Sequence, residues 1–342
     1  MPKTAKSIAD TINAPGHVSS HGRAPLAPFE DALARLRVEG NVLLHGLHSP
    51  PWAADVPDGK VLRDLMGFPG NVQVVPFHVV LNGEMELQPD GGQPVRLVAG
   101  DIAMCPVGTA HRMFHGRYQT VRRFEDVLAS SLGAVKLDQA PGGHNRTDLV
   151  CGAFVLKSAP LNPLLSSLPA VLKVGSRSDE ADPMLALIVK MLELELAREN
   201  RNNFATSRLI EILFAEALRA HGARQGHAKP GWFRGLTDSK IGSALCEIHA
   251  DPGVRWSVGA LAQRVAMSPS RFAARFRDVT GQTVMTYVTS WRMSLACREL
   301  IETRKGLTEI AMQIGYQDTA AFSRAFKSAI GLSPAHWRSC HG

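Results

Sequence analysis

The 342-residue sequence predicts an α+β fold: a β-rich N-terminal half, a helical hairpin, and a C-terminal all-α domain with two helix-turn-helix units. Short apolar segments separated by Gly-rich turns fill much of residues 29–178, which is typical of a small double-sheet β-barrel. Apolar residues at helical spacing follow in residues 179–222. Residues 237–340 then contain nearly the same helical unit twice.

The composition is that of a globular protein with a polyanionic partner. Hydrophobic residues make up 45% and charged residues 20% of the chain, which argues against a disordered protein. The net charge is +7, and residues 231–342 hold 14 Lys and Arg against 8 Asp and Glu, so +6 of it lies there. A basic excess confined to the helical repeat is what binding to a nucleic acid requires.

Neither the N-terminus nor the cysteines indicate export. Residues 1–28 have no apolar run long enough for a signal peptide and are predicted to be a flexible leader. No later stretch is long and apolar enough to cross a membrane. The five cysteines are dispersed and form no C-x-x-C pair, which favours reduced thiols. We therefore expect a cytoplasmic protein with no membrane partner.

In chain order, the β-rich region should begin with a short helix at Phe29–Val38, where apolar residues fall at helical spacing. Segments of strand character follow at Asn41–Gly46, Val72–Leu81, Glu84–Leu87, Val95–Leu97 and Ile102–Cys105. Asn82-Gly83 is a strong signal for a two-residue turn between two hairpin strands.

Two amphipathic helices should follow the barrel as a hairpin, the first opened by Pro183. The recurring apolar residues are Met184, Leu187, Ile188, Met191 and Leu192 in the first helix, and Ile210, Leu213, Phe214, Ala217 and Leu218 in the second. Stripes of this breadth pack either against the barrel of the same chain or against a second copy in a homodimer. The stretch at 223–236, with Pro230-Gly231, is the predicted linker to a domain at 237–340.

The repeated unit has the pattern of a short helix, a turn and a second helix, at Leu261–Gly281 and at Ile310–Gly331. Each second helix has two phenylalanines at i and i+4 that should face the core. These pairs are Phe272/Phe276 and Phe322/Phe326. Ser268 in the first copy, and Asp318 or Thr319 in the second, are placed to cap the second helix. Each copy therefore fits a helix-turn-helix.

This region resembles the DNA-binding domain of AraC/XylS-family transcription regulators. The resemblance is carried by Ile310-Ala311, Gly315-Tyr316, Phe322-Ser323-Arg324-Ala325-Phe326-Lys327, Gly331, Pro334 and Arg338. It implies that the second helix of each unit reads a major groove of double-stranded DNA, in grooves about 34 Å apart. The candidate DNA-binding residues are Ser268, Ser270, Arg271, Ala274, Arg275, Thr319, Ala320, Ser323, Arg324, Lys327 and Arg338. Lys327 and Arg338 are expected on phosphates.

A second resemblance concerns the β-rich region. Gly100, Pro106, Gly108 and His111 match in spacing the second sequence motif of the cupin superfamily, and His78 falls where the first motif places its second histidine. This is similar to the cupin-type N-terminal domain of one branch of AraC/XylS regulators. It implies an effector site in the barrel with His78 and His111 as contacts.

The cupin set of metal ligands is incomplete in this sequence. Pro76 stands where the first histidine would be, and Asn82 or Gly83 stands at the glutamate position. Two of the four ligands remain, fewer than the three protein ligands that a catalytic metal needs. The sequence therefore argues against a metal-dependent enzyme, and no cofactor is expected.

Two interpretations of His78 and His111 stay open. They could form a metal site with His45, His144 or Cys151, or they could be hydrogen-bonded barrel residues or effector contacts. Cys105 and Cys151 are expected to be buried, inert thiols, because nothing in the sequence points to a lowered pKa at either one.

Taken together, the resemblances imply a transcription regulator and not an enzyme. They imply a regulator that meets RNA polymerase at a promoter, as an activator or as a repressor. It should form a homodimer through the helical hairpin and respond to an unknown small-molecule effector. Two alternatives remain. One is a regulator that binds DNA without a ligand, with the barrel as scaffold, and the other is a cupin enzyme with a DNA-binding tail.

Overall fold

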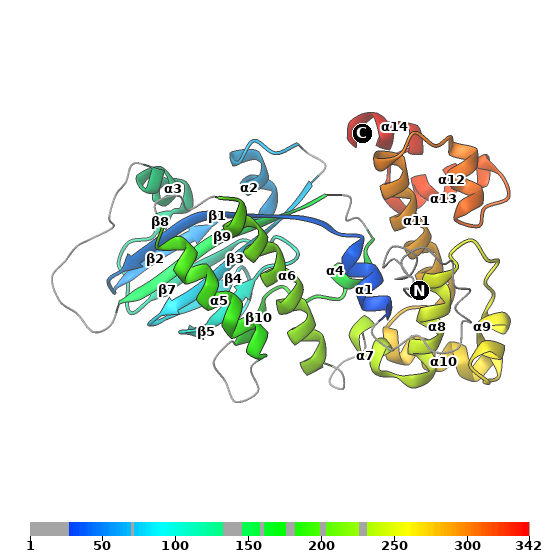
Figure 1. The fold of residues 1–342 in the computed structure, drawn as a ribbon, viewed down its shortest axis with the longest axis horizontal. Coiled ribbons are helices and arrows are strands. Elements are labelled where there is room, and N and C mark those ends of the chain that lie inside the picture. Colours follow the sequence, from blue (N-terminus) through cyan, green and yellow to red (C-terminus); the bar gives the residue numbers. More distant parts are fainter. Residues whose placement is uncertain are drawn as a thin grey trace, which may run out of the picture.

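A computed structural model gives the fold of the chain (Figure 1). It describes residues 27–69, 72–132, 146–157, 161–175, 182–198, 203–225 and 231–341. Within them, a β-domain with a helical hairpin precedes an all-helical domain, so the predicted α+β class is confirmed. The predicted leader at 1–28 lies outside the described residues except for Ala27 and Pro28.

The β-domain contains two five-stranded sheets. The strands are β1 (Arg37–His48), β2 (Trp52–Val56), β3 (Val72–Asn82), β4 (Glu84–Pro89), β5 (Val95–Val98), β6 (Asp101–Met104), β7 (His111–His115), β8 (Arg122–Arg123), β9 (Thr147–Lys157) and β10 (Leu172–Gly175). The first sheet has the order β1-β9-β3-β6-β10 and the second the order β5-β4-β7-β2-β8. Their facing sides enclose an apolar core, as expected for a double-sheet barrel.

The first sheet is buried on both of its faces. One face packs on the second sheet, and helices α5 (Pro183–Leu196) and α6 (Phe204–Gln225) cover the other (Figure 1). For this reason β3 is buried at nearly every position instead of at alternate ones. The close approach of α6 depends on Gly40 in β1, where a Cβ atom would lie 2.3 Å from Cγ2 of Ile210.

The turn at Asn82-Gly83 is confirmed, but the hairpin predicted around it is wrong. Gly83 has the left-handed backbone that the turn needs, with φ +77°. However, β3 pairs with β9 on one side and with β6 on the other, so no edge of β3 is free for β4. The chain therefore crosses at this turn from the first sheet to the second, where β4 pairs with β5 and β7.

The helices of the N-terminal half position the sheets and reach the C-terminal domain. They are α1 (Ala27–Ala34), α2 (Gly59–Leu65), α3 (Phe124–Leu132) and α4 (Pro163–Ser166), followed by the hairpin α5 and α6. The predicted helix at Phe29–Val38 ends early, because β1 begins at Arg37. The hairpin is confirmed, and Asp182 caps α5 by accepting a hydrogen bond from the Met184 amide at 2.9 Å.

The C-terminal domain consists of eight described helices. They are α7 (Trp232–Thr237), α8 (Ser239–Ala250), α9 (Val258–Arg264), α10 (Pro269–Thr280), α11 (Val284–Glu302), α12 (Leu307–Gln313), α13 (Thr319–Ile330) and α14 (Pro334–His341). Figure 1 shows α11 between two groups of helices, with α8 to α10 at one end and α12 to α14 at the other. The predicted pair of helical units joined by one long helix is confirmed.

The linker predicted at 223–236 is corrected at both of its ends. Helix α6 continues to Gln225, and α7 occupies the segment from Trp232 onward. Trp232 and Phe233 are only 2% and 5% exposed, so α7 belongs to a packed core. Residues 226–230 of the predicted linker lie outside the described residues.

The two halves of the molecule meet through α1, which lies beside the C-terminal domain in Figure 1. Phe29 packs against the rings of Trp232 and Phe233, with centroid distances of 6.4 and 6.3 Å. The guanidinium of Arg35 lies 5.0 Å from the centroid of the Trp291 ring, within cation–π range. Because of these contacts, one apolar cluster runs from the first sheet through α1 into the C-terminal helices.

Candidate nucleic-acid interface and effector cavity

The first helix-turn-helix consists of α9 and α10. Ser257 caps α9 by accepting a hydrogen bond from the Ala260 amide at 3.1 Å, and Ala266 turns the chain with a left-handed φ of +53°. Phe272 and Phe276 are both fully buried, as predicted. Ser268 occupies the N-cap position of α10, but its hydroxyl makes no capping hydrogen bond, so the cap predicted from this side chain is wrong.

The second unit, α12 and α13, repeats this construction. Gly315 turns the chain with φ +87°, and Oδ1 of Asp318 accepts a hydrogen bond from the Ala321 amide at 2.7 Å, so Asp318 and not Thr319 provides the predicted cap. Phe322 and Phe326 are fully buried. Both second helices therefore present one fixed face to the core and the opposite face to solvent.

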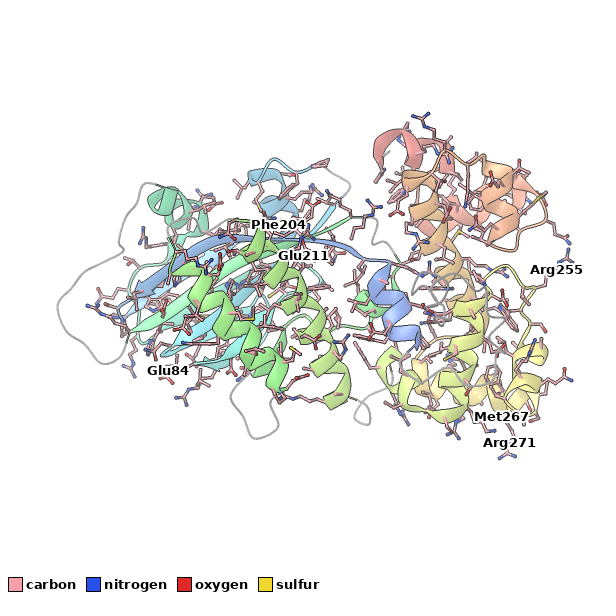
Figure 2. All side chains as sticks on the ribbon, viewed as in Figure 1. Glu84, Phe204, Glu211, Arg255, Met267 and Arg271 are labelled. Carbon is pink, nitrogen blue, oxygen red and sulfur yellow. The ribbon has the colours of Figure 1, made fainter. Side chains whose placement is uncertain are left out.

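The predicted DNA-binding side chains lie on those solvent faces. Ser268, Ser270, Arg271, Ala274 and Arg275 are exposed on and before α10, and Ala320, Arg324 and Lys327 are exposed on α13, whereas Thr319 and Ser323 are half-buried. In Figure 2 Arg271 extends away from the rest of the C-terminal domain. Sequence reasoning missed Lys240, which lines a hollow of about 300 Å³ together with Arg271 and Arg275.

Two of the predicted arginines have partners within the domain. Nη2 of Arg275 lies 2.8 Å from Oδ2 of Asp238, and about half of the Arg275 side chain stays exposed. Arg338 donates from Nε to the Leu300 carbonyl at 3.0 Å and from Nη2 to the Lys305 carbonyl at 2.6 Å. This guanidinium holds α14 against the end of α11, and the phosphate contact expected of Arg338 stays a prediction.

His78 and His111 meet inside the β-domain. Their Nε2 atoms are 2.7 Å apart, His78 Nδ1 lies 3.1 Å from Sγ of Cys151, and His111 Nδ1 lies 2.9 Å from the Thr109 carbonyl. A carbonyl only accepts, so His111 Nδ1 has the proton and its Nε2 accepts from His78 Nε2. His78 Nδ1 then accepts from the Cys151 thiol. With all three side chains neutral, the ring nitrogens of both histidines and the Cys151 thiol each have a hydrogen-bond partner.

Burial keeps the side chains of His78, His111 and Cys151 neutral. Burial lowers the pKa of His78 well below its usual value, with a further contribution from His111. Burial also lowers the pKa of His111 and raises the pKa of Cys151. Burial raises the pKa of Cys105 to about 12, so neither thiol has the thiolate character of a redox sensor.

The candidate metal residues do not come together as one site. Among the described residues, no three His, Cys, Asp or Glu side chains are arranged to hold a metal ion. Nε2 of His45 lies 3.2 Å from Oδ1 of Asp148, and His144 lies outside the described residues. His78 is only 1% exposed and its polar contacts are hydrogen bonds within the core, so the effector contact expected of it stays a prediction.

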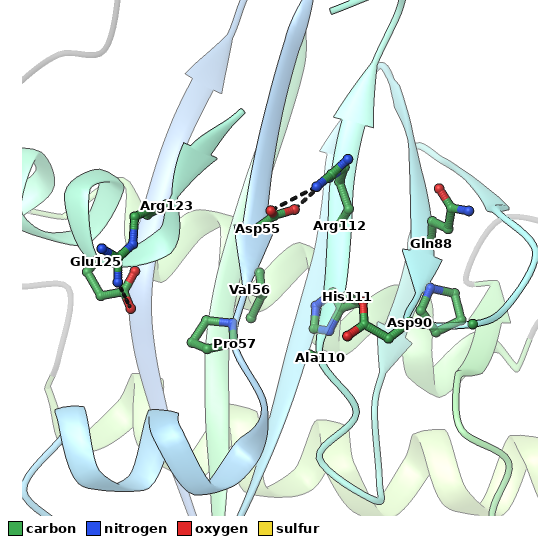
Figure 3. A pocket seen from close by; sticks show the side chains of 12 residues that line it. Asp55, Val56, Pro57, Gln88, Asp90, Ala110, His111, Arg112, Arg123 and Glu125 are labelled. Atoms are coloured by element: carbon green, nitrogen blue, oxygen red, sulfur yellow. Dashed lines mark hydrogen bonds and ion pairs between the residues drawn. The ribbon is translucent and has the colours of Figure 1, made fainter. Parts of the chain in front are cut away.

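His111, in contrast, borders a hollow of about 520 Å³ on the second sheet (Figure 3). Its lining residues are Asp55, Val56, Pro57, Gln88, Pro89, Asp90, Gly91, Ala110, His111, Arg112, Arg123 and Glu125. Arg112 donates to both carboxylate oxygens of Asp55, at 2.6 and 2.9 Å. The hollow therefore combines ordered charges of both signs with hydrogen-bonding groups, and would suit a polar molecule better than a hydrocarbon.

Comparisons with known proteins agree with this architecture. Residues 27–223, more than half of the chain, match the family model described as Cupin, and residues 261–339 match one described as Helix-turn-helix domain. A putative AraC-like transcription regulator of Streptomyces lividans is 30% identical over 320 residues, covering 91% of this chain and 97% of its own. The chain belongs to the AraC family of transcription regulators.

One further relative matches over most of the chain, and one solved structure matches its C-terminal part. The regulator AlkR of Acinetobacter baylyi is 27% identical over 268 residues, which cover 76% of this chain and 86% of AlkR. A crystal structure of the AdpA DNA-binding domain in complex with a target DNA is 27% identical, covering 28% of this chain and 86% of its own, with a TM-score of 0.28. The curated relatives are transcription regulators, not enzymes, and this AraC-family member is a DNA-binding transcription regulator.

No described helix of this AraC-family regulator is long and apolar enough to cross a membrane.

Proposed function

We propose that this regulator binds promoter DNA as a homodimer in the cytoplasm, reads two successive major grooves with α10 and α13, and responds to a polar effector in the hollow beside His111. The observation that best supports the proposal is the pair of second helices, α10 and α13, at opposite ends of α11. Each of them exposes arginine on the face opposite its buried phenylalanines. That is the arrangement in which helix-turn-helix units enter DNA.

Within this proposal, Arg271 and Arg324 read base edges, because both are exposed on a second helix and neither forms an ion pair with another residue that the structure describes. Lys327 and Lys240 neutralise phosphates. Arg275, which pairs with Asp238, does so as well. Ser268, Ser270, Thr319, Ala320 and Ser323 complete the surface. Ala274 offers only a methyl group, which suits contact with a thymine methyl.

The DNA proposal is tested by Arg271→Ala and Arg324→Ala on an operator obtained by in vitro selection. Each change should cost ~1–3 kcal/mol of specific binding and relax the base preference at one position. Arg117→Ala is the matched control, because Arg117 is an exposed arginine of the β-domain. If neither variant binds the operator more weakly than the control does, the assignment of α10 and α13 is wrong.

The dimer proposal rests on an apolar stripe along α5 that is exposed among the residues the structure describes. Met184, Leu187, Met191 and Leu194 are between 46% and 59% exposed. Their 3-4-3 spacing is that of a seam between paired helices. The other side of α5 is buried against its own chain through Leu185, Ile188, Val189, Leu192 and Leu196. The stripe is therefore available to a second copy.

A charge placed in that stripe should separate the two copies. We expect Leu187→Glu to sediment as a monomer at micromolar concentration, because a carboxylate would have to be desolvated in the seam. Lys190→Glu changes an exposed side chain of the same helix and should stay dimeric. Wild-type protein that sediments as a monomer at this concentration would overturn the proposal.

The effector proposal predicts that polar compounds binding in the hollow stabilise the protein in a thermal-shift screen. A stabilising compound should lose its effect in Arg112→Ala, because this change removes the guanidinium that Asp55 orients. If no compound raises the melting temperature, the ligand-independent alternative is favoured.

RNA polymerase and activation remain part of the proposal. In vitro transcription from the selected operator tests them, and an unchanged or reduced yield would contradict activation.

A further inference from the structure

Arg292, on the middle of α11, joins the two helix-turn-helix units directly. Its Nε donates to the Pro252 carbonyl at 2.8 Å, and its Nη2 donates to the Val254 carbonyl at 2.6 Å. Both carbonyls belong to the loop between α8 and α9, which leads into the first unit. The side chain is half-buried, and the hydrogen bond from its Nε is partly shielded from water.

The same guanidinium lies against the turn of the second unit. Its central carbon is 5.9 Å from the centroid of the Tyr316 ring, within cation–π range. A Cβ atom at Gly315 would lie 2.6 Å from Nη2 of Arg292 and 2.7 Å from the Gly253 carbonyl oxygen. Gly315 also has φ +87°, so this position favours glycine on both steric and conformational grounds.

Loop and turn also touch each other beside Arg292. A Cβ atom at Gly253 would lie 2.9 Å from the carbonyl oxygen of Gln313. Two glycines thus allow a loop of the first unit and a turn of the second to come together around one side chain. We refer to Arg292, Gly253 and Gly315 as the Arg292 junction.

Helix α11 alone would allow the two helix-turn-helix units to move relative to each other. The Arg292 junction is a second connection between them, and it restricts this motion. Helix α11 is held to the first unit through Trp291 and Tyr287, which are buried, and to α14 through the hydrogen bond from Trp337 to the Cys297 carbonyl at 3.2 Å. A bend or twist of α11 would change the separation of α10 and α13. With the Arg292 junction in place, such a bend would have to break the hydrogen bonds or the stacking of Arg292.

We propose that Arg292 is a positioning residue that sets the separation and relative rotation of the two recognition helices, and hence the operator spacing that this regulator accepts. Lysine cannot replace it, because a single ammonium does not offer the planar fork that reaches two carbonyls while stacking on a ring. The proposal concerns the coupling between two binding units and adds no contact to DNA.

The test measures DNA affinity as a function of operator spacing, using fluorescence anisotropy and full-length protein at low ionic strength. The duplexes hold the selected operator, the same operator with one base pair inserted or removed between its two half-motifs, and each half-motif alone. Wild-type protein should lose affinity steeply, about tenfold or more, when the spacing changes by one base pair. Arg292→Met should bind the native spacing about tenfold more weakly and show a flattened spacing profile.

One control variant and one second disruption of the junction separate positioning from general damage to the fold. Arg298→Met removes an arginine of the same helix that pairs with Glu299 and Glu302, and it should keep the wild-type profile. Gly253→Ala leaves Arg292 in place but pushes the loop against the Gln313 carbonyl, and it should flatten or shift the profile as Arg292→Met does.

The proposal requires that Arg292→Met keeps its affinity for each isolated half-motif to within about threefold, since neither unit loses a DNA contact. A uniform loss on all duplexes with an unchanged spacing profile would overturn it. If Arg292→Met does not fold, Arg292→Lys and Gly253→Ala decide the question in the same assay. A wild-type profile in both of those variants would also overturn it.

Discussion

Among individual residues, His249 shows most directly how burial sets a protonation state. Its ring stacks on Trp291 at a centroid distance of 3.7 Å, and its Nε2 lies 2.6 Å from the Tyr287 hydroxyl. Trp232 donates its only indole proton to that hydroxyl at 2.9 Å. Nδ1 of His249 is buried and has no hydrogen-bond partner among the described residues, so a charged ring would leave a buried N–H unpaired. Burial, and then the nearby Arg35, lower the pKa of His249 to about 3.

This arrangement predicts a pH-dependent stability that one substitution should reduce. The unfolded chain binds a proton at His249 near pH 6.5 and the folded chain only near pH 3. Between these values the unfolded state holds more protons, so unfolding becomes easier as the pH falls, by up to about 1.4 kcal/mol per pH unit. His249→Phe keeps a stacking ring but cannot titrate. In urea unfolding at pH 7, 6, 5 and 4.5, its free energy of unfolding should fall less steeply than that of wild type.

Other buried histidines titrate in the same direction, so the comparison is between slopes and not between absolute stabilities. Burial lowers the pKa of His48 to about 4, and His78 and His111 are shifted downward too. These groups act equally in wild type and variant. Equal slopes for the two proteins would show that His249 is protonated in the folded state.

At the scale of elements, sequence periodicity predicts those features of helices and strands that are set by residues close together in the sequence. Phe272 and Phe276 could be predicted because a helix brings i and i+4 to one face, and β3 because it is mostly apolar and rich in valine. Patterns could not show which edge of β3 was already taken, so Asn82-Gly83 was misread as a hairpin turn. They also could not show that the carbonyls of Leu300 and Lys305 accept hydrogen bonds from Arg338. Such partners lie far apart in sequence, and only the fold brings them together.

The contact between α6 and β1 allows a prediction at this scale. Gly40 is buried under Ile210, and a Cβ atom there would lie 2.7 Å from the Cβ of Ile210, which cannot rotate away. Gly40→Ala should therefore cost ~1–3 kcal/mol of folding free energy. Gly259→Ala is the matched control, because the nearest atom to its Cβ is 3.9 Å away and alanine favours helix α9. Thermal denaturation should show a loss for the first variant and no loss for the second. Equal melting temperatures would mean that α6 can move off the sheet at little cost.

At the scale of the whole molecule, α1 is the element that makes effector control of DNA binding physically reasonable. It leads directly into β1 of the β-domain, and its own side chains pack on helices of the DNA-binding half. Arg37 adds an ion pair with Glu302 on α11, with an N–O distance of 2.8 Å. Any shift of the β-domain must therefore move or break contacts at the base of the recognition units.

Phe29 is the residue on which this coupling can be tested. It is 3% exposed, packs on Trp232 and Phe233, and lies under the Arg219 guanidinium at 5.9 Å. Wild-type protein should unfold in one calorimetric transition, because the two halves share a core. Phe29→Ala should cost ~3–5 kcal/mol at that shared core and resolve the unfolding into two transitions. Phe204→Ala, which removes a ring that is 78% exposed, should keep the single transition. One unshifted transition in Phe29→Ala would show that the halves are coupled elsewhere than through α1.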